Sequence, residues 1–211
     1  MNSLVTRFHL LLAAVTLAIT GVALFRVPAE FLFVARWSGG TPLWQWPRDI
    51  ALAVGPGLSV LLLVVFFVMG RLFTKNQFAK SQHILDPALS LVLAIITATQ
   101  LGLLLNGFGS DLDLIRFTGL GLGLTLLLLG VVLYEAERHT YAGMRMPWPI
   151  AGDRAWTVVH RAAGSTVFLA GAGLLVLAWF DAGIGPMVMG FAVAVLGPAL
   201  IAGTATMLVR R

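Results

Sequence analysis

Six long runs of apolar residues constrain the fold of this chain more than any other feature. Each run has roughly the 20 residues that an α-helix needs to cross the hydrocarbon core of a bilayer. A transmembrane β-barrel would instead show short segments of alternating polarity, and that pattern is absent from the sequence. We therefore predict an all-α integral membrane protein, a bundle of six transmembrane helices at residues 8–25, 50–70, 88–108, 117–134, 162–180 and 186–209.

The composition agrees with this prediction. Of the 211 residues, 59% are apolar and 11% are charged, whereas soluble domains have about 45–50% and about 25%. A soluble globule of this size could not hide so much apolar surface, and a disordered chain would be polar and highly charged. These numbers exclude a soluble enzyme. Cysteine is absent, which excludes disulfides, thiol nucleophiles and thiolate metal sites.

The basic residues of the loops predict the orientation in the membrane. With a cytoplasmic N-terminus, ten Lys and Arg and four Asp and Glu lie inside, against four Lys and Arg and five Asp and Glu outside. Because short cytoplasmic loops are enriched in Lys and Arg, we predict that both termini are cytoplasmic. The net charge of +5 then requires no direct nucleic-acid partner, since the bilayer accounts for it. The first run exceeds a usual signal-peptide core, so we expect it to remain as a span.

Loop lengths divide the chain into two expected units. Residues 1–87 form an N-terminal unit of two spans joined by an extracytoplasmic loop at residues 26–49, the one outer loop long enough to recognise a ligand. Residues 88–211 form a four-span unit with a long cytoplasmic loop at residues 135–161. Function is therefore expected in these two loops.

The spans themselves carry few polar residues. Proton relays and ion pumps place Asp, Glu, His or Arg at membrane depth, and the span centres lack them, which disfavours ion-coupled transport. Gln100 either lines a pocket or holds helices together, which is the commoner use of a buried amide. Glycines of the last three spans predict close packing within the chain, with the oligomeric state left open; they are Gly119, Gly121, Gly123, Gly164, Gly171, Gly173, Gly190 and Gly197.

The cytoplasmic loop has an unusual order of residues. Pro147 and Pro149 favour an extended path, and Trp148 between them suits the lipid headgroup layer. Asp153 is expected to cap a helix that runs into the fifth span. Along that helix Trp156 and His160 share one stripe, and a second stripe holds Arg154, Thr157, Arg161 and Ser165.

The two stripes permit two interpretations. The cations of the second stripe suit phosphates or the carboxylates of a partner, while the first stripe offers an aromatic and an imidazole edge. The alternative is a collar of positive charge with an interfacial Trp, which fixes orientation without binding anything specific.

This segment resembles the signature of the SdpI family, bacterial membrane proteins whose namesake confers immunity to a secreted toxin. The residues in register with that signature are Gly143, Arg145, Pro147, Trp148, Trp156, His160, Arg161 and Gly164. Residues 26–56 are loosely similar to a domain of unknown function that often accompanies the family, with Glu30 where a His is usual.

The resemblance implies a multi-pass protein of the bacterial plasma membrane that acts in immunity or signal reception, without catalytic residues, metal or cofactor. It implies a membrane-active peptide as the outer partner and a small cytoplasmic regulator as the inner one. The candidate inner residues are Gly143, Arg145, Pro147, Trp148, Asp153, Trp156, His160, Arg161 and Gly164. The candidate outer residues are Glu30, Trp37, Trp44, Trp46 and Arg48, although tryptophans also serve as interfacial anchors.

Two alternatives remain open from the sequence. An integral membrane enzyme or lipid-handling protein would use acid, base or metal-ligating groups at the cytoplasmic face, drawn from Glu135, Glu137, His139, Asp153 and His160. The first three are spaced by two, which does not place them on one face of a helix. A small-molecule transporter is the third candidate, disfavoured by the missing intramembrane charges.

Overall fold

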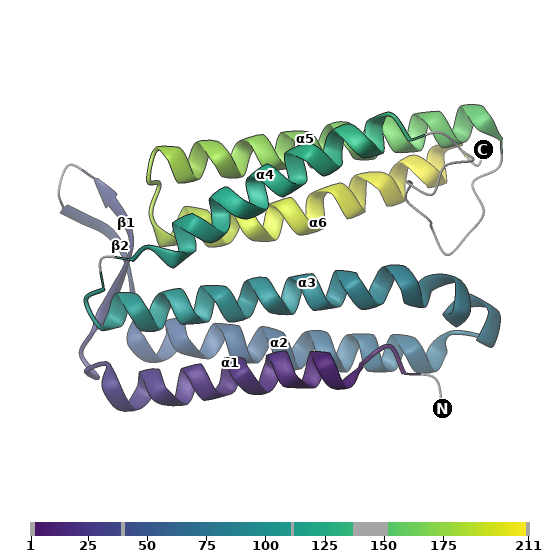
Figure 1. Ribbon diagram of the computed structural model, residues 1–211. Coiled ribbons are helices and arrows are strands. Elements are labelled where there is room, and N and C mark those ends of the chain that lie inside the picture. Colours follow the sequence, from purple (N-terminus) through teal and green to yellow (C-terminus); the bar gives the residue numbers. More distant parts are fainter. Residues whose placement is uncertain (1–2, 39–40, 111, 137–151, 210–211) are drawn as a thin grey trace. The chain divides into compact units, whose positions relative to one another are not determined.

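The computed structural model describes residues 3–38, 41–110, 112–136 and 152–209, and for residues 36–38, 75–81, 83, 84 and 209 it describes the backbone alone. Six helices and one two-stranded sheet make up these ranges (Figure 1). In chain order they are α1 (Arg7–Arg26), β1 (Leu32–Ser38), β2 (Thr41–Pro47), α2 (Arg48–Leu72), α3 (Lys75–Gly107), α4 (Leu114–Tyr134), α5 (Asp153–Trp179) and α6 (Ile184–Val209).

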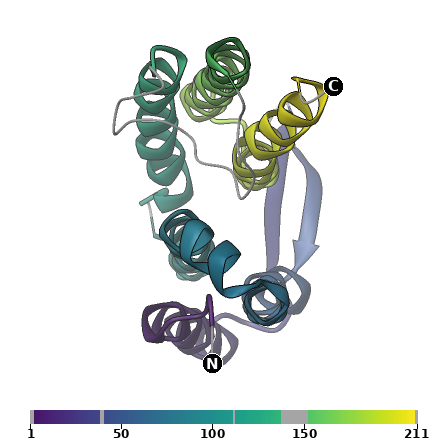
Figure 2. The same ribbon diagram turned by 90° about the vertical axis from the view of Figure 1, so that its right-hand side faces the viewer.

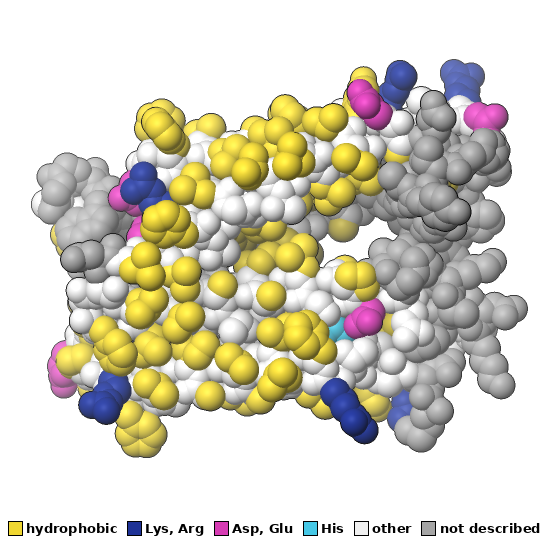
Figure 3. Space-filling view, in the orientation of Figure 1, with side chains coloured by type: hydrophobic (Ala, Val, Ile, Leu, Met, Phe, Trp, Pro, Cys, Tyr) yellow, Lys and Arg dark blue, Asp and Glu magenta, His cyan; other side chains and the backbone are white. Residues whose placement is uncertain are grey.

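Every predicted span is confirmed by a helix long and apolar enough to cross a membrane. The spanning segments are Arg7–Arg26, Arg48–Leu72, Leu85–Gly107, Leu114–Tyr134, Asp153–Trp179 and Ile184–Leu208. Apolar side chains cover the lengths of the helices, and the coloured charged side chains stand near their ends (Figure 3). Such a surface is expected of helices that are surrounded by lipid. The chain is a multi-pass membrane protein.

The chain divides into two compact units, residues 1–118 and 119–211. In the first, α1, α2 and α3 all pack on one another; in the second, α5 packs on α4 and α6 (Figure 2). The division expected at residue 87 falls inside α3. Because α3 packs against both α1 and α2, this helix lies in the first unit.

Residues 71–87, which lie between the second and third predicted spans, are mostly helical. Only Phe73 and Thr74 separate α2 from α3, which continues across Pro87 to Gly107. Residues 75–86 contain neither Gly nor Pro, so little opposes a helix there.

The outer loop contains a hairpin that the sequence analysis did not predict. Strands β1 and β2 pair antiparallel, with Phe33 opposite Trp46 and Val34 opposite Gln45. Phe33 and Ala35 are buried, as expected when alternate residues of a strand face the protein. The missed signal is the Gly pair at residues 39–40 between two runs rich in aromatic and apolar residues. We call residues 32–47 the outer hairpin.

Glycines bring α4 and α5 close together in the second unit. A Cβ atom on Gly171 would lie 2.6 Å from the carbonyl oxygen of Gly123, and one on Gly130 would lie 2.6 Å from the amide nitrogen of Phe168. Backbones approach this closely only where side chains are missing. In lipid the hydrophobic effect does not drive helices together, so the dispersion contacts of this close packing hold them. The prediction of packing within the chain is confirmed for Gly123 and Gly171, whereas a Cβ on Gly121, Gly173 or Gly197 would meet nothing within 4 Å.

Candidate functional site

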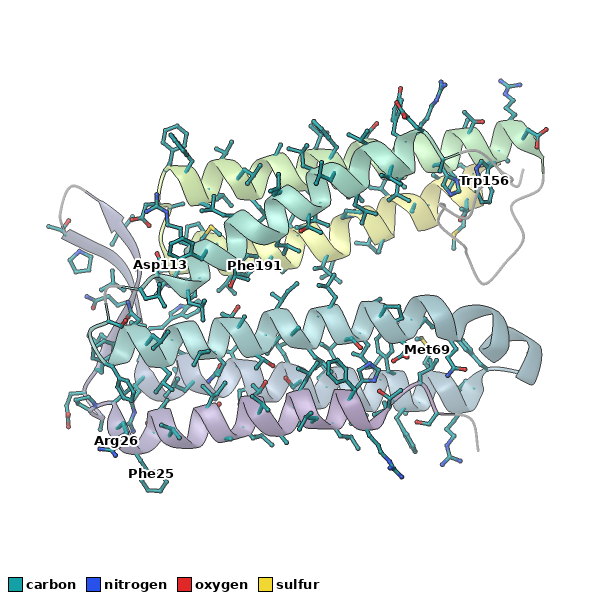
Figure 4. All side chains as sticks on the ribbon, in the orientation of Figure 1. Phe25, Arg26, Met69, Asp113, Trp156 and Phe191 are labelled. Atoms are coloured by element: carbon teal, nitrogen blue, oxygen red, sulfur yellow. The ribbon has the colours of Figure 1, made fainter. Side chains whose placement is uncertain are left out.

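The inner site lies where α4 ends and α5 begins. The indole Nε1 of Trp156 donates a hydrogen bond of 3.0 Å to the carbonyl oxygen of Ala136, two residues after α4. Trp156 stands near the beginning of α5 (Figure 4). This bond fixes the start of α5 to the end of α4. We call this bond, together with the ring of His160 that stacks on Trp156, the inner latch.

His160 is fully buried and completes the inner latch. Its ring stacks on that of Trp156, with centroids 4.0 Å apart and planes 20° apart. Its Nδ1 lies 3.0 Å from the carbonyl oxygen of Trp156. Because a carbonyl oxygen only accepts, Nδ1 carries the proton in this bond. The aromatic and imidazole stripe anticipated from the spacing is therefore a packed contact.

Gly164 continues the same face one turn deeper. A Cβ there would lie 2.5 Å from the amide nitrogen of Tyr134 and 2.7 Å from the carbonyl oxygen of Gly130. Both neighbours are backbone and cannot move aside cheaply. Glycine at this position permits the approach of α4 that the inner latch needs.

The second stripe lies on the face of α5 that points away from the helix packing. All four members are exposed, and we call them the cationic stripe: Arg154, Thr157, Arg161 and Ser165. The guanidinium carbon of Arg161 lies 5.5 Å from the ring centroid of Tyr134, a cation–π contact that holds the side chain against the end of α4. The two stripes thus have different tasks: one packs, and the other remains accessible.

One detail of the predicted helix start was wrong. Gly152 is the N-cap of α5, with φ +86, and Asp153 is the first helical residue. A φ in that range favours glycine, while an acidic residue in the first turn still complements the helix dipole. The remaining motif residues, Gly143, Arg145, Pro147 and Trp148, lie outside the described residues, as do Glu137 and His139.

The candidate outer site is the outer hairpin. Trp44 is 37% exposed, and its ring meets that of Trp46 edge to face, with centroids 5.0 Å apart. The two tryptophans project from the same face of β2, because they are two residues apart. Trp37 pairs with Pro42 across the strands. Trp44 and Trp46 thus form a partly exposed aromatic face on β2.

Arg48 anchors the base of the outer hairpin. Its guanidinium donates to the carbonyl oxygen of Val27 at 2.8 Å, and its backbone N–H donates to that of Phe31 at 3.1 Å. The same guanidinium pairs with Asp49 at 2.8 Å. An arginine at the C-terminal end of α1 also opposes the negative end of its dipole. Glu30, nearby, is exposed.

A buried polar ladder joins the helices of the first unit. Thr16 of α1 bonds Thr97 of α3 at 2.8 Å, and Gln100 of α3 donates to Thr20 of α1 at 2.9 Å. Gln100 also donates to the carbonyl oxygen of Leu52 in α2 at 3.0 Å. The expectation that Gln100 holds helices together is confirmed.

The bond to Leu52 has a chemical cause in Pro56. In a regular helix the carbonyl of Leu52 would accept from the N–H four residues later, and proline has none. Gln100 supplies the missing donor from another helix, and Gly55 leaves room for its amide oxygen. A proline inside a membrane helix is tolerated when a neighbour satisfies the freed carbonyl in this way.

His9 is a second buried histidine that sequence reasoning did not single out. Its Nε2 lies 3.1 Å from Asp86 Oδ1 and 2.9 Å from Ser90 Oγ, while its Nδ1 accepts from the N–H of Thr6. In a Ser–His–Asp relay the carboxylate and hydroxyl occupy opposite ring nitrogens. Here both occupy Nε2, so the arrangement ties α1 to α3 and does not relay a proton.

Within the described part of the chain, no three His, Asp or Glu side chains gather as metal ligands would. No known protein-family model matches the sequence, and no solved structure matches the chain. The chain is similar to the immunity protein SdpI of Bacillus subtilis (strain 168), with 24% identity over 162 residues. The match covers 77% of this chain and 76% of that protein.

Proposed function

We propose that this chain, which belongs to the SdpI family of bacterial membrane proteins, is a non-enzymatic immunity protein that counters a membrane-active antimicrobial peptide. The name of the Bacillus relative supports an immunity role at the level of the family. The six apolar helices supply the setting, the plasma membrane that such a peptide attacks. Sensing of the peptide by the outer hairpin and a response at the cytoplasmic face are the finer parts of the proposal.

The observation that carries the outer part is the aromatic face of the outer hairpin. Trp44 and Trp46 offer rigid contact area that loses little side-chain entropy on binding. The base of the hairpin is held by Arg48 and by buried Val27 and Phe33, so the face is preorganised. Glu30, two residues before β1, is exposed and offers a charged group for orientation.

The inner latch and cationic stripe support the second part. A cytoplasmic regulator would meet the exposed start of α5, and Trp156 and His160 connect this helix to α4 beneath it. A shift of α5 against α4 would disturb that contact. The inner latch is therefore suited to transmit a movement of the membrane-spanning part of α5 to the cytoplasmic face. The buried, stacked ring of His160 favours this role over catalysis. Turnover of a lipid by the pure protein would favour the enzymatic alternative instead.

The immunity proposal is tested in a sensitive bacterium that expresses the chain. Growth is measured against a panel of purified membrane-active peptides, and we expect the wild-type protein to raise the inhibitory concentration of at least one of them fourfold or more. Replacing Trp37, Trp44 and Trp46 together by alanine should remove this protection. The matched control is Trp179→Ala, since Trp179 is an exposed tryptophan at the end of α5 on the predicted outer side.

The outcomes separate the parts of the proposal. If no peptide is countered, the immunity role fails. If the triple variant protects as well as wild type, capture by the outer hairpin fails. In the same cells, Arg161→Ala should leave the amount of protein in the membrane unchanged and end the protection; normal protection would reduce the cationic stripe to an orientation signal.

A further inference from the structure

The cationic stripe carries two arginines on a face that packs against nothing described. Arg154 and Arg161 are exposed, and in the described part of the chain neither forms a salt bridge with a carboxylate. Arg161 contacts the ring of Tyr134, itself 47% exposed. Basic side chains stand at the end of the second unit where α5 begins (Figure 3). Two cations on one helix face, with no carboxylate partner among the described residues, offer a site for an anion.

The length of α5 gives the depth of these arginines. Its 27 residues span about 40 Å at 1.5 Å per residue, whereas the hydrocarbon core is about 30 Å thick. The C-terminal end carries exposed Trp179 and Phe180, aromatic residues of the kind that sit at an interface. About 20 residues counted back from Trp179 reach Val159, which puts Arg161 at the opposite boundary. Arg154 lies about 10 Å farther out, among the headgroups.

Apart from Thr157 and Ser165 of its own stripe, the exposed side chains around Arg161 on α5 are apolar. Val158 is 44% exposed, Phe168 38% and Leu169 67%. On a membrane helix these side chains meet acyl chains. An occupant of this surface must therefore place an anionic group at the boundary and an apolar tail beside the helix. The carboxylate of a water-soluble partner would have to enter the headgroup layer to reach Arg161.

We propose that the cationic stripe binds an anionic phospholipid, with Arg161 on the phosphate and Arg154 on the outer part of the headgroup layer. A planar guanidinium donates two parallel hydrogen bonds to a phosphate, and the ring of Tyr134 holds it in position for this. Bound lipid contacts the same turn of α5 that carries His160 and so steadies the inner latch. This inference does not depend on the immunity role, because lipid binding is a property of the isolated protein.

The test uses the purified full-length protein in neutral detergent, with native mass spectrometry of bound lipid. Phosphatidylglycerol is compared with phosphatidylcholine of the same acyl chains. Each basic residue near an anionic surface contributes about fivefold to affinity, so Arg154→Gln with Arg161→Gln should weaken phosphatidylglycerol binding about 25-fold. Phosphatidylcholine binding should change by less than twofold. Arg161→Lys, which keeps the charge but loses the fork, should fall between wild type and the double variant.

The control is Arg7→Gln with Arg71→Gln, an equal loss of charge on the same predicted side of the membrane at two exposed arginines. We expect this control to keep phosphatidylglycerol affinity within about threefold of wild type. Equal losses in the two double variants would overturn the proposal, because net charge alone would then govern binding. Equal affinity of wild type for the two lipids would also overturn it, leaving an acidic segment of a cytoplasmic protein as the occupant. All four substitutions are at exposed side chains, and far-UV circular dichroism checks that the helices are retained.

Discussion

Gln100→Leu is expected to destabilise the first unit because Pro56 leaves a carbonyl that Gln100 satisfies. The side chain is 1% exposed and donates to Leu52 and Thr20. Leucine has a similar volume, so little cavity forms. Thr20 keeps its bond to the carbonyl oxygen of Thr16 at 2.8 Å, but the oxygen of Leu52 loses its donor.

The magnitude follows from these two bonds. The bond to Thr20 contributes about 0.6 kcal/mol, the average for an interhelical hydrogen bond in a membrane protein. A buried acceptor left without a partner costs about 1–3 kcal/mol. We expect Gln100→Leu to lower the free energy of unfolding by about 2 kcal/mol. Gln100→Leu should cost less in a background where Leu52 has another donor.

Pro56→Ala provides that background, since an alanine at position 56 supplies the N–H that a regular helix offers to Leu52. There, Gln100→Leu should cost only about 0.6 kcal/mol, the bond to Thr20. The assay is a double-mutant cycle on purified protein, with unfolding by SDS in mixed micelles followed by circular dichroism. The expected coupling between the two positions is about 1–2 kcal/mol. If the two effects add to within about 0.3 kcal/mol, the explanation of the Gln100 contact is wrong.

Two further predictions concern the close approach of α4 and α5 and the base of the outer hairpin. Gly164→Ala should lower the free energy of unfolding by about 1–3 kcal/mol, because its Cβ would meet backbone of α4. Gly173→Ala on the same helix has nothing within 4 Å and should be neutral or stabilising. Equal effects of the two substitutions in a thermal-unfolding assay would contradict this. Arg48→Ala should lower the free energy of unfolding by about 1–2 kcal/mol through loss of the bond to Val27. The control Arg26→Ala, at an exposed side chain, should lower it by less than about 0.5 kcal/mol. Proteolysis within the outer hairpin, measured on folded protein, should accelerate in the Arg48 variant alone.

The candidate site was predictable in part. Helical spacing alone separated Trp156 and His160 from Arg154 and Arg161, because residues four apart share a face whatever they pack against. Spacing did not tell which face is buried; the carbonyl of Ala136 and the glycine at 164 decide that. His9 was missed because a histidine in the first turn of a span reads as an interfacial residue, and its partners Asp86 and Ser90 come from a distant helix.

The sequence by itself determined the membrane location, the number of spans and the periodic faces of α5, because apolar run length and helical period are local quantities. The tertiary structure decided what each polar side chain does. Gln100 became the donor for a proline-freed carbonyl, Arg48 the anchor of a hairpin, and His160 a buried stack. In lipid every buried polar group must find a partner within the protein, and which partner it finds depends on helices far apart in the sequence.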